Sequence, residues 1–324
     1  MPANTDWEMP AEVQPKPGDY GFDLEAALTS VVGLKANIPE DAFTASVLGT
    51  EREGSAVVIR SDGLVLTIGY LITEAESVWL TCADGRAIPG HALAYDFETG
   101  FGLVQALGRV NLPALNFGDP SDLQGGERVV LAAEGGRRHA LEARVAGRRD
   151  FAGYWEYLIE GAIFTVPAHP AWSGAALIGE DGGLLGIGSL ILQGEARGAR
   201  RDMNMIVPIN LLPPILDDLL AYGRPNKPVR PWLGLYAADS EDGVVVAGLA
   251  DGGPAEQAGI RAGDQIVAIG DGRISDLGSL WRMVWARGSA GVEVPMRLNR
   301  DERTVETRLQ STDRAAFLRR PNMH

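Results

Sequence analysis

A serine with small neighbours, Ser173, is the residue whose type and setting come closest to nucleophilic chemistry. It lies in the stretch Ala168-His-Pro-Ala-Trp-Ser-Gly-Ala-Ala-Leu-Ile178, on a predicted tight turn directly before an apolar run. Small neighbours let a substrate carbonyl approach the hydroxyl and let backbone N–H groups point toward a developing oxyanion. The same pattern is also typical of an ordinary turn, because serine and glycine are common turn residues.

Composition excludes several other kinds of chemistry. The 324 residues predict two or three domains, and 45% hydrophobic with 22% charged residues is typical of globular proteins. The net charge of −14 disfavours a nucleic-acid partner, because phosphate binding needs a positive face. A single cysteine, Cys82, excludes an intrachain disulfide and a thiolate cluster. Four scattered histidines suggest no metal, so we expect neither a metal nor a cofactor.

The chain also lacks recognisable membrane and export signals. No run approaches the ~18 consecutive apolar residues that a membrane span needs. The first eight residues have neither a basic region nor an apolar core, so we expect no secretory signal. These features predict a cytoplasmic protein.

Short apolar runs separated by Asp-Gly or Gly-rich turns dominate residues 53–207. Ala56–Arg60 and Leu64–Thr67 flank an Asp-Gly turn, and Ala175–Ile178 and Leu184–Gly188 flank a second one. An Asp-Gly pair between apolar runs is a strong hairpin signal. Many short strands at this spacing indicate an all-β sandwich or barrel.

The pattern changes after residue 208. Apolar residues follow the helical period through 209–222, and Gly223 with three prolines then predicts a linker over 223–230. The final unit combines predicted strands with one helix over 276–287. This unit is therefore expected to be a small α+β module.

An ordered series of motifs resembles the HtrA/Deg family of trypsin-like serine proteases, in which a PDZ domain follows the protease domain. The series begins at Gly54-Ser-Ala-Val-Val-Ile59 and includes Ala171-Trp-Ser-Gly-Ala175, and Gly253-Pro-Ala-Glu-Gln-Ala-Gly259 lies in its PDZ part. The resemblance implies a mainly β fold of two six-stranded β-barrels with the active site between them, followed by a small α+β PDZ domain. The expected divisions are an acidic arm 1–24, a protease-fold domain 25–222, the linker 223–230, a PDZ domain 231–310 and a tail 311–324.

The resemblance also implies a His-Asp-Ser triad, of which this sequence keeps one member. The serine is Ser173. Tyr70, in Thr67-Ile-Gly-Tyr-Leu-Ile72, stands at the position of the histidine base, and Gly100 stands at the position of the orienting aspartate. The oxyanion-hole positions are Ala171, where the family has glycine, and Ser173.

Tyrosine is a poor proton acceptor because its side chain titrates near pH ~10. We therefore expect a pseudoprotease that works as a scaffold, adaptor or regulatory subunit. An active endopeptidase with another base, such as His169 on the same loop, or with partner-dependent activation is an alternative. A purely structural subunit with a closed PDZ groove is another.

The PDZ resemblance implies a site for peptide or protein C-termini. A loop formed by Trp232, Leu233, Gly234 and Leu235 would offer N–H groups to a terminal carboxylate. One face of the following helix, which would line the pocket, carries Leu277, Leu280, Trp281 and Val284. The same residues would also suit a plain hydrophobic core.

Aromatic residues in the proline-rich acidic arm suggest a docking role. Gly18-Asp-Tyr-Gly-Phe-Asp-Leu24 resembles the segment that joins protease domains into trimers in the family. The resemblance implies a homotrimer with contacts at Tyr20 and Phe22. The alternative is that these rings cover their own domain.

Overall fold

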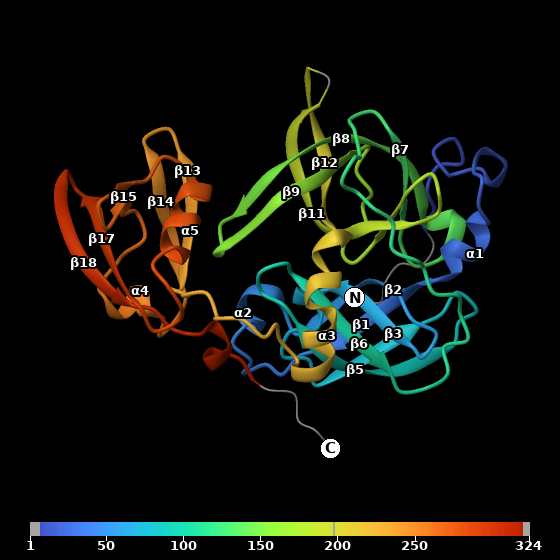
Figure 1. Cartoon of the computed structure of the whole chain (residues 1–324), viewed down its shortest axis with the longest axis horizontal. Coiled ribbons are helices and arrows are strands. Elements are labelled where there is room, and N and C mark those ends of the chain that lie inside the picture. The colour runs from blue at the N-terminus through green and yellow to red at the C-terminus, as the bar shows by residue number, and fades with distance from the viewer. Residues whose placement is uncertain (1–6, 197, 320–324) are drawn as a thin grey trace. The chain divides into compact units, whose positions relative to one another are not determined.

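The computed structural model describes residues 7–196 and 198–319, and the chain forms two compact units (Figure 1). The first unit contains residues up to 149, residues 161–226 and the segment from 319 onward. The second contains residues 150–160 and 227–318. The predicted linker 223–230 spans the boundary between 226 and 227. Parts of the expected arm and tail, 1–6 and 320–324, lie outside the described residues.

The first six strands close into a barrel in the order β1-β2-β3-β6-β5-β4, with every pairing antiparallel. The strands are β1 (Val31–Asn37), β2 (Glu51–Val58), β3 (Leu64–Ile68), β4 (Ser77–Thr81), β5 (Ala87–Tyr95) and β6 (Phe101–Ala106). Side chains such as Leu66, Phe101 and Leu103 are fully buried. They form an interior that excludes water and fixes the barrel.

A second barrel follows in the order β10-β11-β12-β9-β8-β7. Its strands are β7 (Arg128–Ala132), β8 (Ala140–Gly153), β9 (Tyr157–Val166), β10 (Ala176–Ile178), β11 (Leu184–Ala196) and β12 (Ala199–Pro208). Leu131, Leu141, Ile163, Leu177 and Ile206 belong to its core. The prediction of two six-stranded barrels is confirmed. The β8–β9 hairpin tip, however, belongs to the second compact unit.

Short helices complete the first unit. The α-helices are α1 (Leu24–Thr29), α2 (Ala45–Leu48) and α3 (Pro213–Tyr222), and the 3₁₀ turns are η1 (Pro17–Asp19), η2 (Gly69–Leu71), η3 (Gly136–His139) and η4 (Ile209–Leu211). The helix expected over 209–222 is thus split into η4 and α3. Two prolines fit the first turn of α3, where their missing N–H groups need no partner. Gly223 ends α3 with a left-handed backbone (φ 72°).

The described part of the acidic arm packs on the second barrel. The Trp7 ring stacks on His139 with centroids 4.5 Å apart, and Met9 is buried in the barrel's core. Tyr20 donates a hydrogen bond to Glu142 (3.1 Å), and Phe22 lies against Gly182. Tyr20 and Phe22 are half-buried in their own domain. Their trimer contact stays a prediction.

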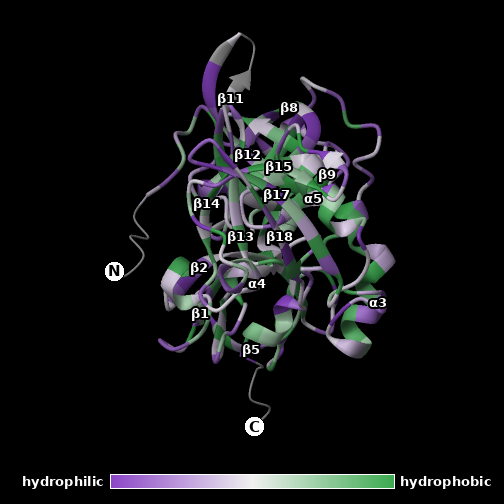
Figure 2. Cartoon of the chain, turned by 90° about the vertical axis from the view of Figure 1, so that its left-hand side faces the viewer, coloured by the Kyte–Doolittle hydropathy of each residue, from purple (hydrophilic) through white to green (hydrophobic). Residues whose placement is uncertain are grey.

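The second unit is built on the sheet β13-β14-β15-β17-β18, with β16 paired to β15. The strands are β13 (Leu235–Ser240), β14 (Gly243–Leu249), β15 (Gln265–Ile269), β16 (Gly272–Arg273), β17 (Glu293–Arg300) and β18 (Arg303–Gln310), and the helices are α4 (Pro254–Gln257), α5 (Leu277–Trp285) and the 3₁₀ turn η5 (Arg314–Phe317). The strands and α5 share one hydrophobic core, and Figure 2 shows hydrophobic segments on both the strands and the helix. The predicted small α+β module is confirmed.

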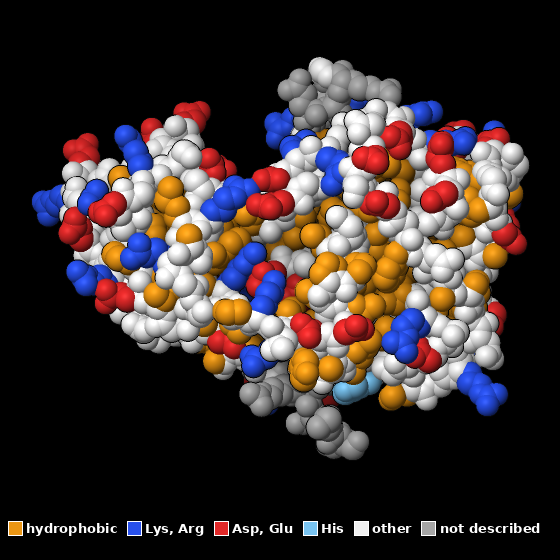
Figure 3. Space-filling view, viewed as in Figure 1, with side chains coloured by type: hydrophobic (Ala, Val, Ile, Leu, Met, Phe, Trp, Pro, Cys, Tyr) orange, Lys and Arg blue, Asp and Glu red, His pale blue; other side chains and the backbone are white. Residues whose placement is uncertain are grey.

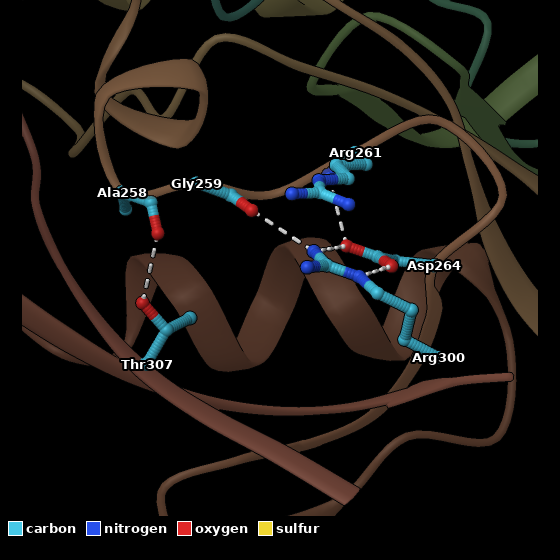
Figure 4. A network of polar contacts seen from close by, with 6 residues as sticks. All are labelled: Ala258, Gly259, Arg261, Asp264, Arg300 and Thr307. Atoms are coloured by element: carbon cyan, nitrogen blue, oxygen red, sulfur yellow. Dashed lines mark hydrogen bonds and ion pairs between the residues drawn. The ribbon is translucent and has the colours of Figure 1, made fainter. Parts of the chain in front are cut away.

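Two features extend or brace this unit. The ring centroids of Trp232 and Phe317 lie 4.9 Å apart, and Trp232 forms an antiparallel β-bridge with Thr312. The unit therefore continues to residue 318. The buried carboxylate of Asp264 accepts two hydrogen bonds of 2.6 Å from Arg300, which also donates to the Gly259 carbonyl (Figure 4). This fork ties the turn before β15 to the end of β17.

On the face drawn in Figure 3, acidic and basic side chains are interspersed. Among the described residues, no helix has the length and apolar content that crossing a membrane requires.

Candidate functional site

The predicted nucleophile and the predicted base position meet between the two barrels. Ser173 lies in the turn between β9 and β10, and Tyr70 lies in η2, directly after β3. The Ser173 carbonyl accepts the Ser55 N–H from β2 at 2.8 Å, which binds the turn to the first barrel. Gly174 permits this contact, because a Cβ there would lie 1.8 Å from the Ser55 carbonyl oxygen and φ is +74°.

The hydroxyl groups of Tyr70 and Ser173 are hydrogen-bonded to each other. Tyr70 also donates to the Ser189 carbonyl of β11 at 2.9 Å. A phenol has a single proton, and Tyr70 directs its proton at the Ser189 carbonyl. The Ser173 hydroxyl is therefore the donor in its hydrogen bond with the Tyr70 oxygen. Within the described part of the chain, no histidine or carboxylate side chain is hydrogen-bonded to the Ser173 hydroxyl.

Burial makes Tyr70 still less suited to accept a proton. Desolvation raises its pKa to about 12, although the hydrogen bond from Ser173 opposes that shift. At pH 7 a group of that pKa is ionised in about one molecule in 10⁵. The pair is therefore a neutral hydrogen-bonded contact, in which the serine proton has no acceptor of useful basicity.

At the position where the resemblance implies an aspartate, this chain has Gly100, which makes backbone contacts only. Gly100 has φ +82°, a conformation that residues with a Cβ adopt at a cost. Its carbonyl accepts the Gly69 N–H at 2.7 Å, beside Tyr70. The nearby Asp96 carboxylate accepts bonds from the Thr99 N–H (2.9 Å) and hydroxyl (2.7 Å). Asp96 thus shapes its own turn.

The loop histidine, His169, is a buried structural group. It is fully buried, its Nε2 lies 2.9 Å from the His139 carbonyl and its Nδ1 accepts the Ala171 N–H at 3.0 Å. Nε2 must therefore donate, and the ring is neutral. Burial lowers its pKa to about 4. The same contact directs the Ala171 N–H, one of the two expected oxyanion donors, to His169.

A buried arginine that the sequence reasoning missed supports the turn that carries Tyr70. Arg52, on β2, donates to the carbonyls of Tyr70 (2.7 Å) and Thr73 (3.0 Å) and to the Thr44 hydroxyl (2.8 Å). The Glu74 carboxylate accepts from that same hydroxyl. Burial lowers the pKa of Arg52 to about 10, which leaves it charged at neutrality. The sequence indicates the role of Arg52 in one way only: a charged residue stands at a strand position that faces inward.

In the second unit, the predicted carboxylate-binding loop holds a carboxylate. The N–H groups of Leu233 and Leu235 donate to Glu156 at 3.0–3.1 Å. Gly234, between them, has φ +74°, which lets the loop turn its N–H groups toward one point. Glu156 comes from the β8–β9 hairpin tip and is buried. Sequence reasoning missed it, because no local pattern links residues 156 and 233.

The predicted pocket residues of α5 are core residues, and one of them also contacts the hairpin. Leu277, Leu280, Trp281 and Val284 are all buried in the unit's hydrophobic core. Trp281 nevertheless donates its indole N–H to the Gly153 carbonyl (2.9 Å), and the Ala237 N–H of β13 donates to the Tyr154 carbonyl (2.9 Å). Hairpin residues thus lie between β13 and α5, where a PDZ ligand is expected.

Comparison with known proteins identifies both domains. A trypsin-like peptidase domain matches residues 54–187, and a PDZ domain matches 231–310. The serine protease Do-like HtrA of Bacillus subtilis is 25% identical over 339 aligned positions, covering 94% of this chain and 74% of that protein.

A probable periplasmic serine endoprotease, DegP-like, of Halomonas elongata is also 25% identical, over 261 positions that cover 76% of this chain. The match covers 54% of that protein, so the chain spans about half the length of several such relatives. Among solved structures, the HtrA-type protease AlgW with a decapeptide superposes with a TM-score of 0.54 at 22% identity, over 92% of this chain and 99% of that one. This likeness supports the fold.

Proposed function

Because this chain joins a trypsin-like peptidase domain to a PDZ domain and is homologous to HtrA and DegP-like proteins, we propose that it is a peptidase-fold protein specialised for binding. In this proposal the peptidase domain does not hydrolyse peptide bonds. The PDZ domain binds the C-termini of peptides or proteins, and the chain acts as a scaffold, adaptor or regulatory subunit.

The observation that carries the proposal is the contact between Ser173 and Tyr70. A serine attacks a carbonyl only if a base removes its proton as the new bond forms. The partner of Ser173 is a neutral phenol with a raised pKa. Loss of the base or the nucleophile lowers turnover by about 10⁶-fold in a serine protease. The bond from the Ala171 N–H to His169 withdraws an oxyanion donor as well.

The PDZ domain supports the binding half of the proposal. Its loop directs the N–H groups of Leu233 and Leu235 at one carboxylate, and β13 offers the Ala237 N–H to an added strand. Two kinds of donor in this arrangement recognise a peptide end: loop N–H groups bind the terminal carboxylate and strand N–H groups bind the chain before it.

The test of the catalytic half compares the purified wild type with Ser173→Ala. Both are incubated with unfolded casein and, separately, with a fluorophosphonate probe that labels activated serines. We expect equal, background casein cleavage and no labelling of either protein. Casein turnover that disappears in Ser173→Ala would overturn the proposal.

The retained serine favours one alternative, a serine endopeptidase that a bound partner activates. Ser173 still lies between the barrels with its hydroxyl at hydrogen-bond distance from the base position. On this alternative, fluorophosphonate labelling of Ser173 appears once a PDZ-binding peptide is added. On the main proposal, labelling stays absent with and without peptide.

A further inference from the structure

We propose that the hairpin tip 153–156 is a built-in ligand of the PDZ domain, with the Glu156 side chain in place of a peptide's terminal carboxylate, and that peptides must displace it. The inference rests on the proposed peptide-binding function and concerns how that same site is controlled.

The carboxylate contact is the first support. Glu156 receives the Leu233 N–H on both carboxylate oxygens (3.1 Å each) and the Leu235 N–H on one of them (3.0 Å). These are the donors that a terminal carboxylate would need, so Glu156 and a peptide end compete for the same N–H groups. The positive charge of Arg314 also acts on Glu156.

The backbone register is the second support. Tyr154 lies two residues before Glu156, and Ala237 lies two residues after Leu235. The Ala237 N–H donates to the Tyr154 carbonyl at 2.9 Å, so the tip runs antiparallel to β13. An incoming C-terminal peptide would add to the same strand edge in the same direction.

Side-chain packing is the third support. The Trp281 indole on α5 donates to the Gly153 carbonyl at 2.9 Å, and the Tyr154 ring meets the Tyr236 ring of β13 edge-on at 6.0 Å. Ala152 packs against the core of the PDZ domain. The tip is therefore held by both walls of the groove as well as by the carboxylate loop.

Glu156 adopts a backbone conformation that a glutamate rarely takes. Its φ is +61°. A non-glycine residue in that region is strained, and the bonds from the loop N–H groups to the Glu156 side chain help to hold it there. This backbone conformation closes the hairpin turn 154–156 and places the carboxylate against the loop.

The test measures binding of decapeptides with a randomised C-terminal tetrapeptide, supplied with either a free or an amidated C-terminus. We compare the wild type, Glu156→Gln, Glu156→Ala and the control Glu241→Gln, which alters an exposed acid in the turn between β13 and β14 of the same unit. We expect free-acid peptides to bind Glu156→Ala at least tenfold more tightly than the wild type, with Glu156→Gln between them. The control should behave as the wild type, and the amidated pool should bind none of the proteins.

A second measurement uses the unaltered chain, so the result does not depend on how the variants fold. Hydrogen exchange of the Trp281 indole N–H, which donates to the Gly153 carbonyl of the tip, should be slow without peptide and should speed up when a peptide displaces the tip. Equal affinity of wild type and Glu156→Ala, with exchange of this indole N–H unchanged in the peptide complex, overturns the built-in ligand. Failure of all four proteins to bind any free-acid peptide instead overturns the proposed peptide-binding function.

Discussion

The hydroxyl of Ser173 donates its hydrogen bond to the phenolic oxygen of Tyr70, whose own proton is donated to the Ser189 carbonyl. This chain of hydroxyls satisfies polar groups between the two barrels and fixes the serine's rotamer. It preserves the geometry of a nucleophile next to a base, with a partner that does not accept protons at neutral pH.

Replacing Tyr70 with histidine should not create a protease. The imidazole would lack an orienting carboxylate, and the Ala171 N–H would still be bound to His169. We expect casein cleavage by Tyr70→His to equal that of the Tyr70→His/Ser173→Ala double variant.

Adding Gly100→Asp should not repair the site either. The φ of +82° at residue 100 imposes of order 1–3 kcal/mol of strain on an aspartate. The double variant Tyr70→His/Gly100→Asp, which keeps Ser173, is expected to melt at a lower temperature than Tyr70→His and to cleave no casein. Robust cleavage at an unchanged melting temperature would show that the missing side chains alone separate this chain from an active enzyme.

His169 should matter for stability at mildly acidic pH. Burial lowers its pKa from 6.5 to about 4, so between these values the unfolded chain binds a proton that the native chain does not. The contribution of His169 to the free energy of unfolding is fully present above pH 6.5 and is lost as the pH falls through 4. The total loss is on the order of 3 kcal/mol.

Urea unfolding of the wild type from pH 7.5 to 4.5 measures this loss. His169→Gln removes the titrating group, so the unfolding free energy of this variant should fall less steeply over that range. The half-buried His91 lies outside the site, and His91→Gln is the control. At pH 7.5, His169→Gln should be destabilised by about 1–3 kcal/mol, because buried partners of the imidazole lose their bonds. A fall of the same steepness in wild type and His169→Gln would contradict the assignment.

Arg52 should be among the most sensitive positions of the first barrel. Its removal leaves the carbonyls of Tyr70 and Thr73 without this donor, beside the Glu74 carboxylate. Breaking a buried charged network typically costs 3–5 kcal/mol, so Arg52→Met should lower the unfolding free energy by that order. Lys35→Met, which removes exposed ion pairs to Glu51 and Glu53, should cost under about 1 kcal/mol. Similar losses in both variants would argue against a special role for Arg52.

The strands were predictable from the sequence because their signals are local. Asp-Gly turns between apolar runs locate the hairpins at residues 61–63 and 180–183, and each strand exposes its pattern within a few residues. The order of motifs then supplied the barrel topology, which local patterns alone leave open. The same order placed Ser173 and Tyr70 in one site, although 103 residues separate them.

Contacts without a local pattern were not predictable. Nothing in Tyr154-Trp-Glu-Tyr157 signals a carboxylate that fits a loop 77 residues later. For the acidic arm, the sequence left open whether its aromatic rings dock on another subunit or cover their own domain. The described residues of the arm cover the second barrel, where Trp7 stacks on His139 and Glu8 pairs with Arg138 (3.0 Å). Side-chain complementarity over such separations depends on the assembled fold.

Peptide binding by the PDZ domain should strengthen as pH rises, if Glu156 is its built-in ligand. Burial raises the pKa of the docked Glu156 to about 7, whereas a released glutamate titrates near its ordinary 4.5. The docked tip thus binds more protons than the released tip between these values. Docking is strongest below pH 4.5 and weakens as pH rises through 7. Tyr236 also faces Glu156, and burial raises its pKa further above its ordinary value, so its phenol stays neutral between pH 5 and 8. The positive charge of Arg314 acts on Glu156 as well.

Fluorescence anisotropy with a free-acid decapeptide at pH 5, 6, 7 and 8 measures the effect at constant ionic strength. Apparent affinity of the wild type should increase by roughly 10- to 100-fold from pH 5 to pH 8. The Glu156→Gln variant cannot titrate at this position, and its affinity should change by less than threefold. A peptide's own terminal carboxylate is ionised throughout this range, so the difference between the two proteins isolates Glu156. Parallel pH profiles for wild type and Glu156→Gln would mean that release of the tip is not linked to ionisation of this carboxylate.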